Sequence, residues 1–175
     1  MNRLDLLTLN RTQQVPCYFF QQENECHFVG RQSGNRSCLR MKMPEKIEPV
    51  MFAPCGMNCL VCYKHCYHKK PCAGCLKSDQ GKPEHCRKCR IKDCVAKRQF
   101  TYCFECPEYS CKQIKRLEKS YNVRCHASLM GNSKMVKEQG MVAFLVQQKE
   151  NYTCPECGGV ISIHDAECSE CQWKM

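Results

Sequence analysis

The sequence predicts a small, metal-dependent α+β protein with an irregular cysteine-rich zinc-knuckle region, short helices and a C-terminal zinc ribbon. Three observations predict this fold class. Cysteine makes up 20 of the 175 residues, a content typical of scaffolds built on thiols. Most cysteines stand in C-x2-C or C-x3-C pairs, which present two thiolates on one tight turn. Large apolar residues are few between 55 and 111, so this region cannot bury enough surface to fold alone.

The chain divides into four predicted parts, which differ in composition and in cysteine spacing. They are a disordered or loosely ordered arm over residues 1–46, a metal-binding domain over 47–121, a helical connector over 122–151 and a zinc ribbon over 152–175. The arm is polar and has no helical or strand periodicity. Its cysteines are too widely spaced for metal knuckles. A translation start at Met41 or Met43 is the alternative interpretation of the arm.

The metal-binding domain is organised by twelve cysteines, all of which are candidate metal ligands. They are Cys55, Cys59, Cys62, Cys66, Cys72, Cys75, Cys86, Cys89, Cys94, Cys103, Cys106 and Cys111. The spacing of Cys59, Cys62 and Cys66 predicts that they share one face of a short helix. Gly56 lets the backbone turn so that amide N–H groups point at the preceding sulfur. The spacing C-x2-C-x4-C occurs twice, from Cys86 and from Cys103, which indicates a shared structural purpose.

Residues 111–150 show helical periodicity. The first helix carries apolar residues at i, i+3 and i+7, and we expect a break over 122–124. A second helix is predicted over 127–138 and a third over 141–150. Gly140 is well placed as the left-handed residue that ends the second helix. The apolar faces of these helices are interpreted as core packing.

The C-terminal cysteines follow the pattern C-x2-C-x10-C-x2-C. This pattern is typical of a zinc ribbon, in which two knuckles flank a short β-hairpin and hold one ion. Gly158 permits a turn after the first knuckle, and residues 160–163 are strand formers. The four candidate ligands are Cys154, Cys157, Cys168 and Cys171.

The central motifs stand in the order C-G-x2-C-x2-C, C-x-G-C, C-x2-C-x-I-x2-C and C-x2-C-P-x3-C-x2-I. This order resembles a prokaryotic family of cysteine-rich domains of unknown function that are regarded as zinc-binding. The resemblance runs from Cys55 to about Leu117, and it implies metal ligands but no established activity. Cys66 is not a fixed part of the family pattern. The helical tail and the ribbon resemble those of longer members.

The candidate thiols would hold about four ions, three in the central block and one in the ribbon. The sequence leaves open which cysteines share an ion. Zinc is the predicted metal, and an iron–sulfur cluster within 55–111 is the alternative, because both accept cysteine-only ligation. Disulfides would require an oxidising compartment and are the other alternative. Cys17, Cys26, Cys38 and Cys125 are left without a predicted metal.

Histidines lie among the thiols but are not predicted as ligands. His65, His68 and His85 are expected at the surface or as hydrogen-bond donors to the ligands, with replacement of a cysteine as the alternative. His164 is expected to be a residue of the ribbon loop, and His126 a capping or exposed residue.

The predicted function is a non-enzymatic, zinc-binding structural or adaptor protein that presents a metal-held surface to a protein or nucleic-acid partner. The chain has no H-E-x-x-H and no H-x-E followed by C-x2-C, which argues against a hydrolytic zinc. The alternative is an iron–sulfur protein in electron transfer or redox sensing. A further hypothesis is a thiol redox or metal-handling role for Cys125, which stands between Arg124 and His126.

The net charge of +10 first suggests nucleic acid as the partner. However, a zinc ion held by four thiolates carries about −2, so four such sites would reduce the net charge to about +2. The basic residues between 64 and 98 are therefore interpreted as a solvated face that balances thiolates. An unidentified protein is the favoured partner, and nucleic acid remains the alternative.

A cytoplasmic protein without membrane contact is predicted. Residues 1–11 lack the apolar segment of a secretory signal. The longest strongly apolar run, over 141–146, is far too short to span a bilayer.

Overall fold

The computed structural model describes residues 41–67 and 70–175, all of which lie within the compact unit Asn35–Met175. Residues 1–40, with most of the predicted arm and its three cysteines, lie outside the described residues, as does His68. No helix among the described residues combines the length and the apolar character that crossing a bilayer requires.

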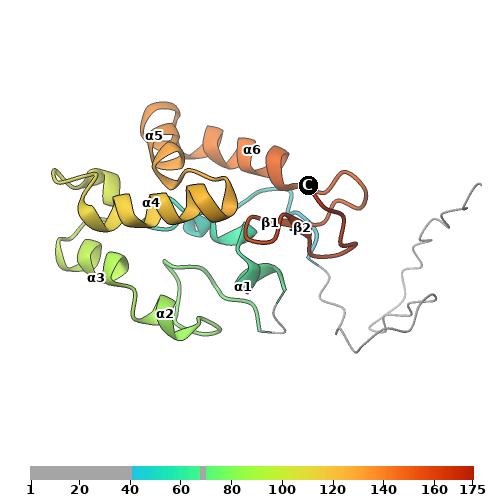
Figure 1. The fold of residues 1–175 in the computed structure, drawn as a ribbon, viewed down its shortest axis with the longest axis horizontal. Coiled ribbons are helices and arrows are strands. Elements are labelled where there is room, and N and C mark those ends of the chain that lie inside the picture. The colour runs from blue at the N-terminus through green and yellow to red at the C-terminus, as the bar shows by residue number, and fades with distance from the viewer. Residues whose placement is uncertain (1–40, 68–69) are drawn as a thin grey trace, which may run out of the picture. The chain divides into compact units, whose positions relative to one another are not determined.

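Short helices and one small sheet make up the described chain (Figure 1). In order they are η1 Pro49–Met51, η2 Cys59–Val61, α1 Tyr63–Cys66, α2 Glu84–Arg87, α3 Arg90–Lys97, η3 Cys103–Glu105, α4 Lys112–Cys125, α5 Leu129–Gln139, α6 Met141–Tyr152, β1 Ile161–Ser162 and β2 Glu167–Cys168. The short helices and the two-stranded antiparallel sheet confirm that part of the predicted fold class.

The helix predicted to carry Cys59, Cys62 and Cys66 on one face is wrong. Cys62 has an extended backbone that separates η2 from α1. The side chain of Asn58 caps η2 by accepting a hydrogen bond from the backbone N–H of Leu60 at 3.0 Å. Cys59 therefore lies in η2 and Cys66 in α1, with Cys62 between the two turns.

The predicted break at 122–124 is also wrong, because α4 continues to Cys125. The segment contains no glycine or proline to end a helix, and Asn122 donates a side-chain hydrogen bond back to Glu118 at 3.3 Å. The helix ends at His126, which adopts the left-handed conformation with φ 49°. The helices predicted over 127–138 and 141–150 are confirmed as α5 and α6, with Gly140 between them at φ 89°.

The main core joins three of the four predicted parts, namely the metal-binding domain, the helical connector and the ribbon. Phe52 is fully buried and packs edge-on against Tyr102 and Phe144, with ring centroids 5.2 and 5.1 Å apart. Figure 1 shows α5 and α6 next to each other and α5 against α4, as their contacts also indicate. The buried residues of this core include Ile47, Met51, Phe52, Leu60, Val61, Leu129, Val136, Phe144, Leu145, Val160 and Ile163. The apolar residues that the central block lacks thus come from α5, α6 and the ribbon.

Residues 41–43, which belong to the described end of the predicted arm, pair with the ribbon. The backbone N–H of Val160 donates to Met41 O at 3.1 Å, and that of Met43 donates to Gly158 O at 2.9 Å. Lys42 and Gly159 form an antiparallel bridge between these bonds. This segment therefore lies along the first knuckle of the ribbon.

Candidate metal centres

The four ribbon thiols form a compact group that can hold a metal ion. Their sulfur atoms all lie within 4.8 Å of one another. Cys154 Sγ lies 3.6 Å from Cys171 Sγ, and Cys157 Sγ lies 3.6 Å from Cys168 Sγ. In a tetrahedral site with Zn–S bonds of about 2.3 Å, neighbouring sulfurs stand about 3.8 Å apart, whereas a disulfide needs about 2.05 Å. The arrangement fits four thiolates around one ion.

Backbone hydrogen bonds hold the two knuckles over the β1–β2 hairpin. The N–H of Gly158 donates to Cys154 O at 2.9 Å, and that of Gln172 donates to Cys168 O at 3.2 Å. A side chain at Gly159 would bring a Cβ atom within 2.7 Å of Cys168 Sγ, so glycine keeps the space that this sulfur occupies. Burial opposes ionisation of Cys154, but backbone N–H groups directed at its sulfur lower its pKa overall.

In the described part of the central block, no three thiols come as close together as those of the ribbon. The cysteines are free thiols throughout the described chain. Instead of one tight group, the central thiols fall into two neighbourhoods, one around Cys75 and one around Cys103. We describe each in turn.

The first neighbourhood centres on the thiols of Cys59 and Cys75. The backbone N–H of Cys75 donates to Cys59 Sγ at 3.4 Å. The two thiols also share a hydrogen bond, which together with the charges of Lys82 and Lys92 lowers the pKa of Cys75 to about 7 against the effect of burial. The same bond and burial raise the pKa of Cys59. One of the two sulfurs is therefore prepared to carry negative charge.

The surrounding thiols of this neighbourhood are held in the neutral form. Burial raises the pKa of Cys55, and nearby Cys75 raises it further, while the backbone N–H of Met57 directed at its sulfur has the opposite effect. Burial, with smaller contributions from neighbouring thiols, raises the pKa of Cys62 to about 11 and that of Cys86 to about 12. A cation among these sulfurs would favour their ionisation.

Two basic side chains fix the loops that carry these thiols. The buried ammonium of Lys82 donates to the carbonyl oxygens of Cys75 and Lys77 at 3.1 and 2.8 Å and to Asp79 at 3.1 Å. His65 Nδ1 lies 2.6 Å from Cys72 O. His65 thus contacts the backbone of a candidate ligand, and His85 lies exposed on α2.

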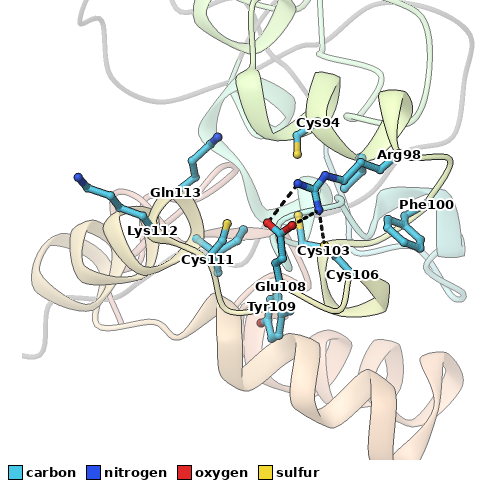
Figure 2. Close-up of a pocket in the computed structure, with 12 residues that line it drawn as sticks. Cys94, Arg98, Phe100, Cys103, Cys106, Glu108, Tyr109, Cys111, Lys112 and Gln113 are labelled. Atoms are coloured by element: carbon cyan, nitrogen blue, oxygen red, sulfur yellow. Dashed lines mark hydrogen bonds and ion pairs between the residues drawn. The ribbon is translucent and has the colours of Figure 1, made fainter.

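The second neighbourhood lines a cavity of about 200 Å³ (Figure 2). Four candidate ligands line this cavity, namely Cys94, Cys103, Cys106 and Cys111. Burial, with smaller contributions from neighbouring thiols that include the other three, raises the pKa of the Cys103 thiol to about 12. Arg98 donates to Cys106 Sγ at 3.3 Å and forms an ion pair with Glu108 at 2.9 Å.

Cys66 and Cys125 make other contacts. Cys66 is fully buried, and its thiol donates to Leu60 O at 3.1 Å. Burial raises the pKa of Cys125, and the charge of Arg124 opposes this rise without reversing it. The raised pKa argues against a redox role of Cys125, which would require a lowered one. Cys89 lies immediately before α3, close enough for its charge to act on Cys55.

Sequence reasoning missed Arg98, Glu108 and Lys82 as residues that act on the candidate ligands. Arg98 follows Cys94 by four residues at the end of α3, so a helical prediction there would have placed both on one face. No comparable signal identifies Lys82, because its partners are backbone carbonyls of a loop.

Comparisons with curated proteins and with solved structures returned no match. A comparison with family models returned one match, which covers less than half of the chain and includes the twelve central cysteines. Through residues 51–116 the chain matches the family described as "Protein of unknown function (DUF3795)", which confirms the resemblance to an uncharacterised cysteine-rich family that the order of its motifs indicated.

Proposed function

We propose that this protein is a zinc-held structural module that presents a surface to a partner protein and has no catalytic centre. The observation that carries the proposal is the group of four ribbon thiols within 4.8 Å of one another. Such a set matches the spacing around one tetrahedral zinc ion and leaves no position open for water. A closed site of this kind stabilises a fold and performs no hydrolysis.

The chemistry of the central thiols supports a structural role for metal there as well. Cys55 and Cys62 are held neutral mainly by burial, so a bound cation would release their protons and fix the loops around them. Two of the histidines that could complete a catalytic zinc have other contacts in the described chain. His65 lies against Cys72 O, and His164 packs between Tyr63 and Tyr121.

A protein partner is supported by the surface of α6 and by the use of the basic residues. Val142 and Val146 are 75 % and 52 % exposed and lie one turn apart, so they share one face of α6. In the basic segment, Lys82, Lys92 and Arg98 contact acidic groups or carbonyls of their own chain. These contacts reduce the positive charge that is free to meet phosphates.

The proposal is tested by elemental analysis and native mass spectrometry of the full chain, purified without oxygen. We expect about four zinc ions per chain, and one fewer in Cys154→Ser/Cys157→Ser. The matched control is Cys125→Ser, which should retain them all. A native protein without tightly bound metal would contradict the proposal. A gel shift at about 50 mM salt tests the partner class, because phosphate contacts are strongest at low salt; a shift would favour nucleic acid.

An iron–sulfur cluster is the second candidate for the central block. It is favoured by one observation, that no three of the described central thiols lie as close together as those of the ribbon. A cluster of several irons spreads its four cysteine ligands more widely than a single ion does. A brown anaerobic preparation containing iron and sulfide would support this candidate over zinc.

A further inference from the structure

We infer that Cys94, Cys103, Cys106 and Cys111 form one four-thiolate metal centre, separate from the ribbon and capped by Arg98. The inference rests on the proposed metal-held module and adds which thiols share a centre. The centre would hold a thiophilic metal, either one zinc ion or an iron–sulfur cluster.

Three elements deliver the four thiols to one place. Cys94 lies on α3, Cys103 begins η3, Cys106 directly follows η3, and Cys111 directly precedes α4. All four line the same cavity of about 200 Å³, and Figure 2 shows their side chains around it. Cysteines separated by up to 17 positions in sequence thus meet at a single cavity.

The backbone fixes the Cys103–Cys106 pair as a knuckle. The N–H of Cys106 donates to Cys103 O at 3.1 Å, which closes the tight turn that a C-x2-C ligand pair needs. The N–H of Cys103 donates to Pro54 O at 2.9 Å. This second bond anchors the knuckle to the segment that precedes Cys55.

A small apolar cluster, which includes Cys103 itself, packs α3, η3 and α4 together. Val95, Cys103 and Ile114 are its buried members, at 6 %, 7 % and 3 % exposure. Val95 follows Cys94 directly, and Ile114 lies three residues after Cys111. The side chains that pack the elements are therefore next to those that carry the sulfurs, so the packing sets the distances between the thiols.

Arg98 supplies positive charge at the edge of the cavity. Its guanidinium donates to Cys106 Sγ at 3.3 Å and holds both oxygens of Glu108, at 2.9 and 3.1 Å. Four thiolates around a divalent ion carry about −2 in total. Arg98 remains charged at any working pH, so it offsets part of this charge and hydrogen-bonds the thiolate of Cys106. Because Arg98 and Glu108 are both exposed to water, their ion pair itself adds little stability.

The size of the cavity bears on the identity of the metal. A single zinc ion would draw the thiols inward to sulfur–sulfur distances of about 3.8 Å. A cluster of several irons would occupy the space with less movement of the ligands. Both outcomes assign the same four cysteines to one centre.

The first test counts metal centres in the full chain by native mass spectrometry, with the element identified by plasma mass spectrometry. We expect Cys103→Ser/Cys106→Ser to lose one centre, and the variant with all four cysteines replaced by serine to lose that same one and no more. Adding Cys154→Ser/Cys157→Ser should remove one further centre. A fourfold variant that keeps the wild-type number overturns the inference.

The second test does not depend on whether the variants fold. The wild-type chain is produced with ¹¹³Cd, and correlations between cadmium and cysteine β-protons are recorded by NMR. We expect β-protons of the four cysteines to correlate with a single cadmium resonance. Correlation with two different resonances, or the absence of one of the four from that resonance, overturns the inference.

The contribution of Arg98 is measured separately. Arg98→Ala should increase the rate at which a chelator removes this centre several-fold, while Arg98→Lys, which keeps the charge, should restore part of the protection. The rate for the ribbon ion provides the internal control and should not change. Equal rates in wild type and Arg98→Ala would contradict the capping role.

Failure of this inference can be distinguished from failure of the proposed function. Metal bound to the ribbon and to other central thiols, but not to these four together, overturns the inference alone. A protein without tightly bound metal overturns both. An iron–sulfur cluster on the four cysteines supports the inference and overturns zinc as the metal of the central block.

Discussion

The ribbon and the central block place the same kind of ligand in two different ways. In the ribbon, four thiols lie within 4.8 Å of one another around a hairpin of two-residue strands. In the described part of the central block no such group occurs, and the thiols border a core that contains Phe52 and Phe144. Two knuckles on one hairpin meet by local geometry, whereas the central knuckles depend on tertiary packing to bring them together.

The largest expected effect comes from complete removal of metal. Structural zinc contributes roughly 10–16 kcal/mol of apparent binding energy per site at neutral pH. We therefore expect chelation to abolish amide protection over 154–171 and 86–111, while α5 and α6 remain protected longer because their apolar contacts persist. Hydrogen exchange with mass spectrometry measures this difference. Unchanged exchange after verified metal removal would contradict metal dependence in both regions.

Truncation of the core tests whether the central block depends on apolar packing. Phe52→Ala removes a fully buried ring that packs against two other aromatic rings. We expect about 3–5 kcal/mol loss in the free energy of unfolding, measured by denaturant titration of metal-loaded protein. The ribbon should retain its ion. The exposed control Val142→Ala should change stability by no more than about 0.5 kcal/mol. Equal effects of the two variants would argue against the core described above.

A smaller effect is expected where the C-G motif approaches α5. At Gly56 a Cβ atom would lie 2.2 Å from Leu129 O, and φ is +93°. We expect Gly56→Ala to destabilise the protein by at least about 1–3 kcal/mol, the cost of the backbone conformation alone. Gly140→Ala is the matched control, because its φ is +89° but its Cβ would meet nothing within 4 Å. The difference in melting temperature between the two variants isolates the close approach, and equal melting temperatures would refute it.

The smallest expected effect is a dependence of stability on pH at the contact between the ribbon and α4. Burial lowers the pKa of His164, with Asp165 opposing and Arg124 assisting this shift. His164 Nε2 lies 3.1 Å from the hydroxyl of Tyr121. The folded state therefore binds the proton less readily than the unfolded chain, whose histidine pKa is about 6.5. The contribution of neutral His164 to stability is therefore complete above the unfolded-state pKa, and it is lost as the pH falls through the folded-state pKa.

Melting temperatures of wild type and His164→Gln are compared between about pH 7.5 and pH 5. This range extends on the order of one unit either side of the unfolded-state histidine pKa. Wild type should lose more stability than the variant, which has no proton to gain at this position. Parallel curves for the two proteins would show that His164 contributes nothing to the pH dependence.

The ribbon could be predicted in detail because its information is local. The spacing from Cys154 to Cys171 defines two knuckles and a hairpin, and the structure brings those four sulfurs together. The helices after Cys111 could be predicted from their apolar periodicity. The break expected at 122–124 did not occur, since contacts within α4, such as that from Asn122 to Glu118, continue the helix through polar residues.

The central block could be predicted only as a set of candidate ligands. Its grouping depends on contacts between distant residues, such as that of Phe52 with Phe144, which no spacing rule encodes. The role of Gly56 was predicted in part. The backbone N–H after it does point at the sulfur of Cys55, but the close approach to Leu129 depends on where α5 packs.

The pairing of residues 41–43 with residues 158–160 has a consequence for biosynthesis. During translation, the partners of Met41 and Met43 leave the ribosome only after the residues up to 160 have been made. Ile47 and Phe52 must likewise wait for Phe144 and Val160, which belong to the same core. Until then the nascent chain exposes these apolar side chains and its free thiols, and it depends on its surroundings to protect both from aggregation.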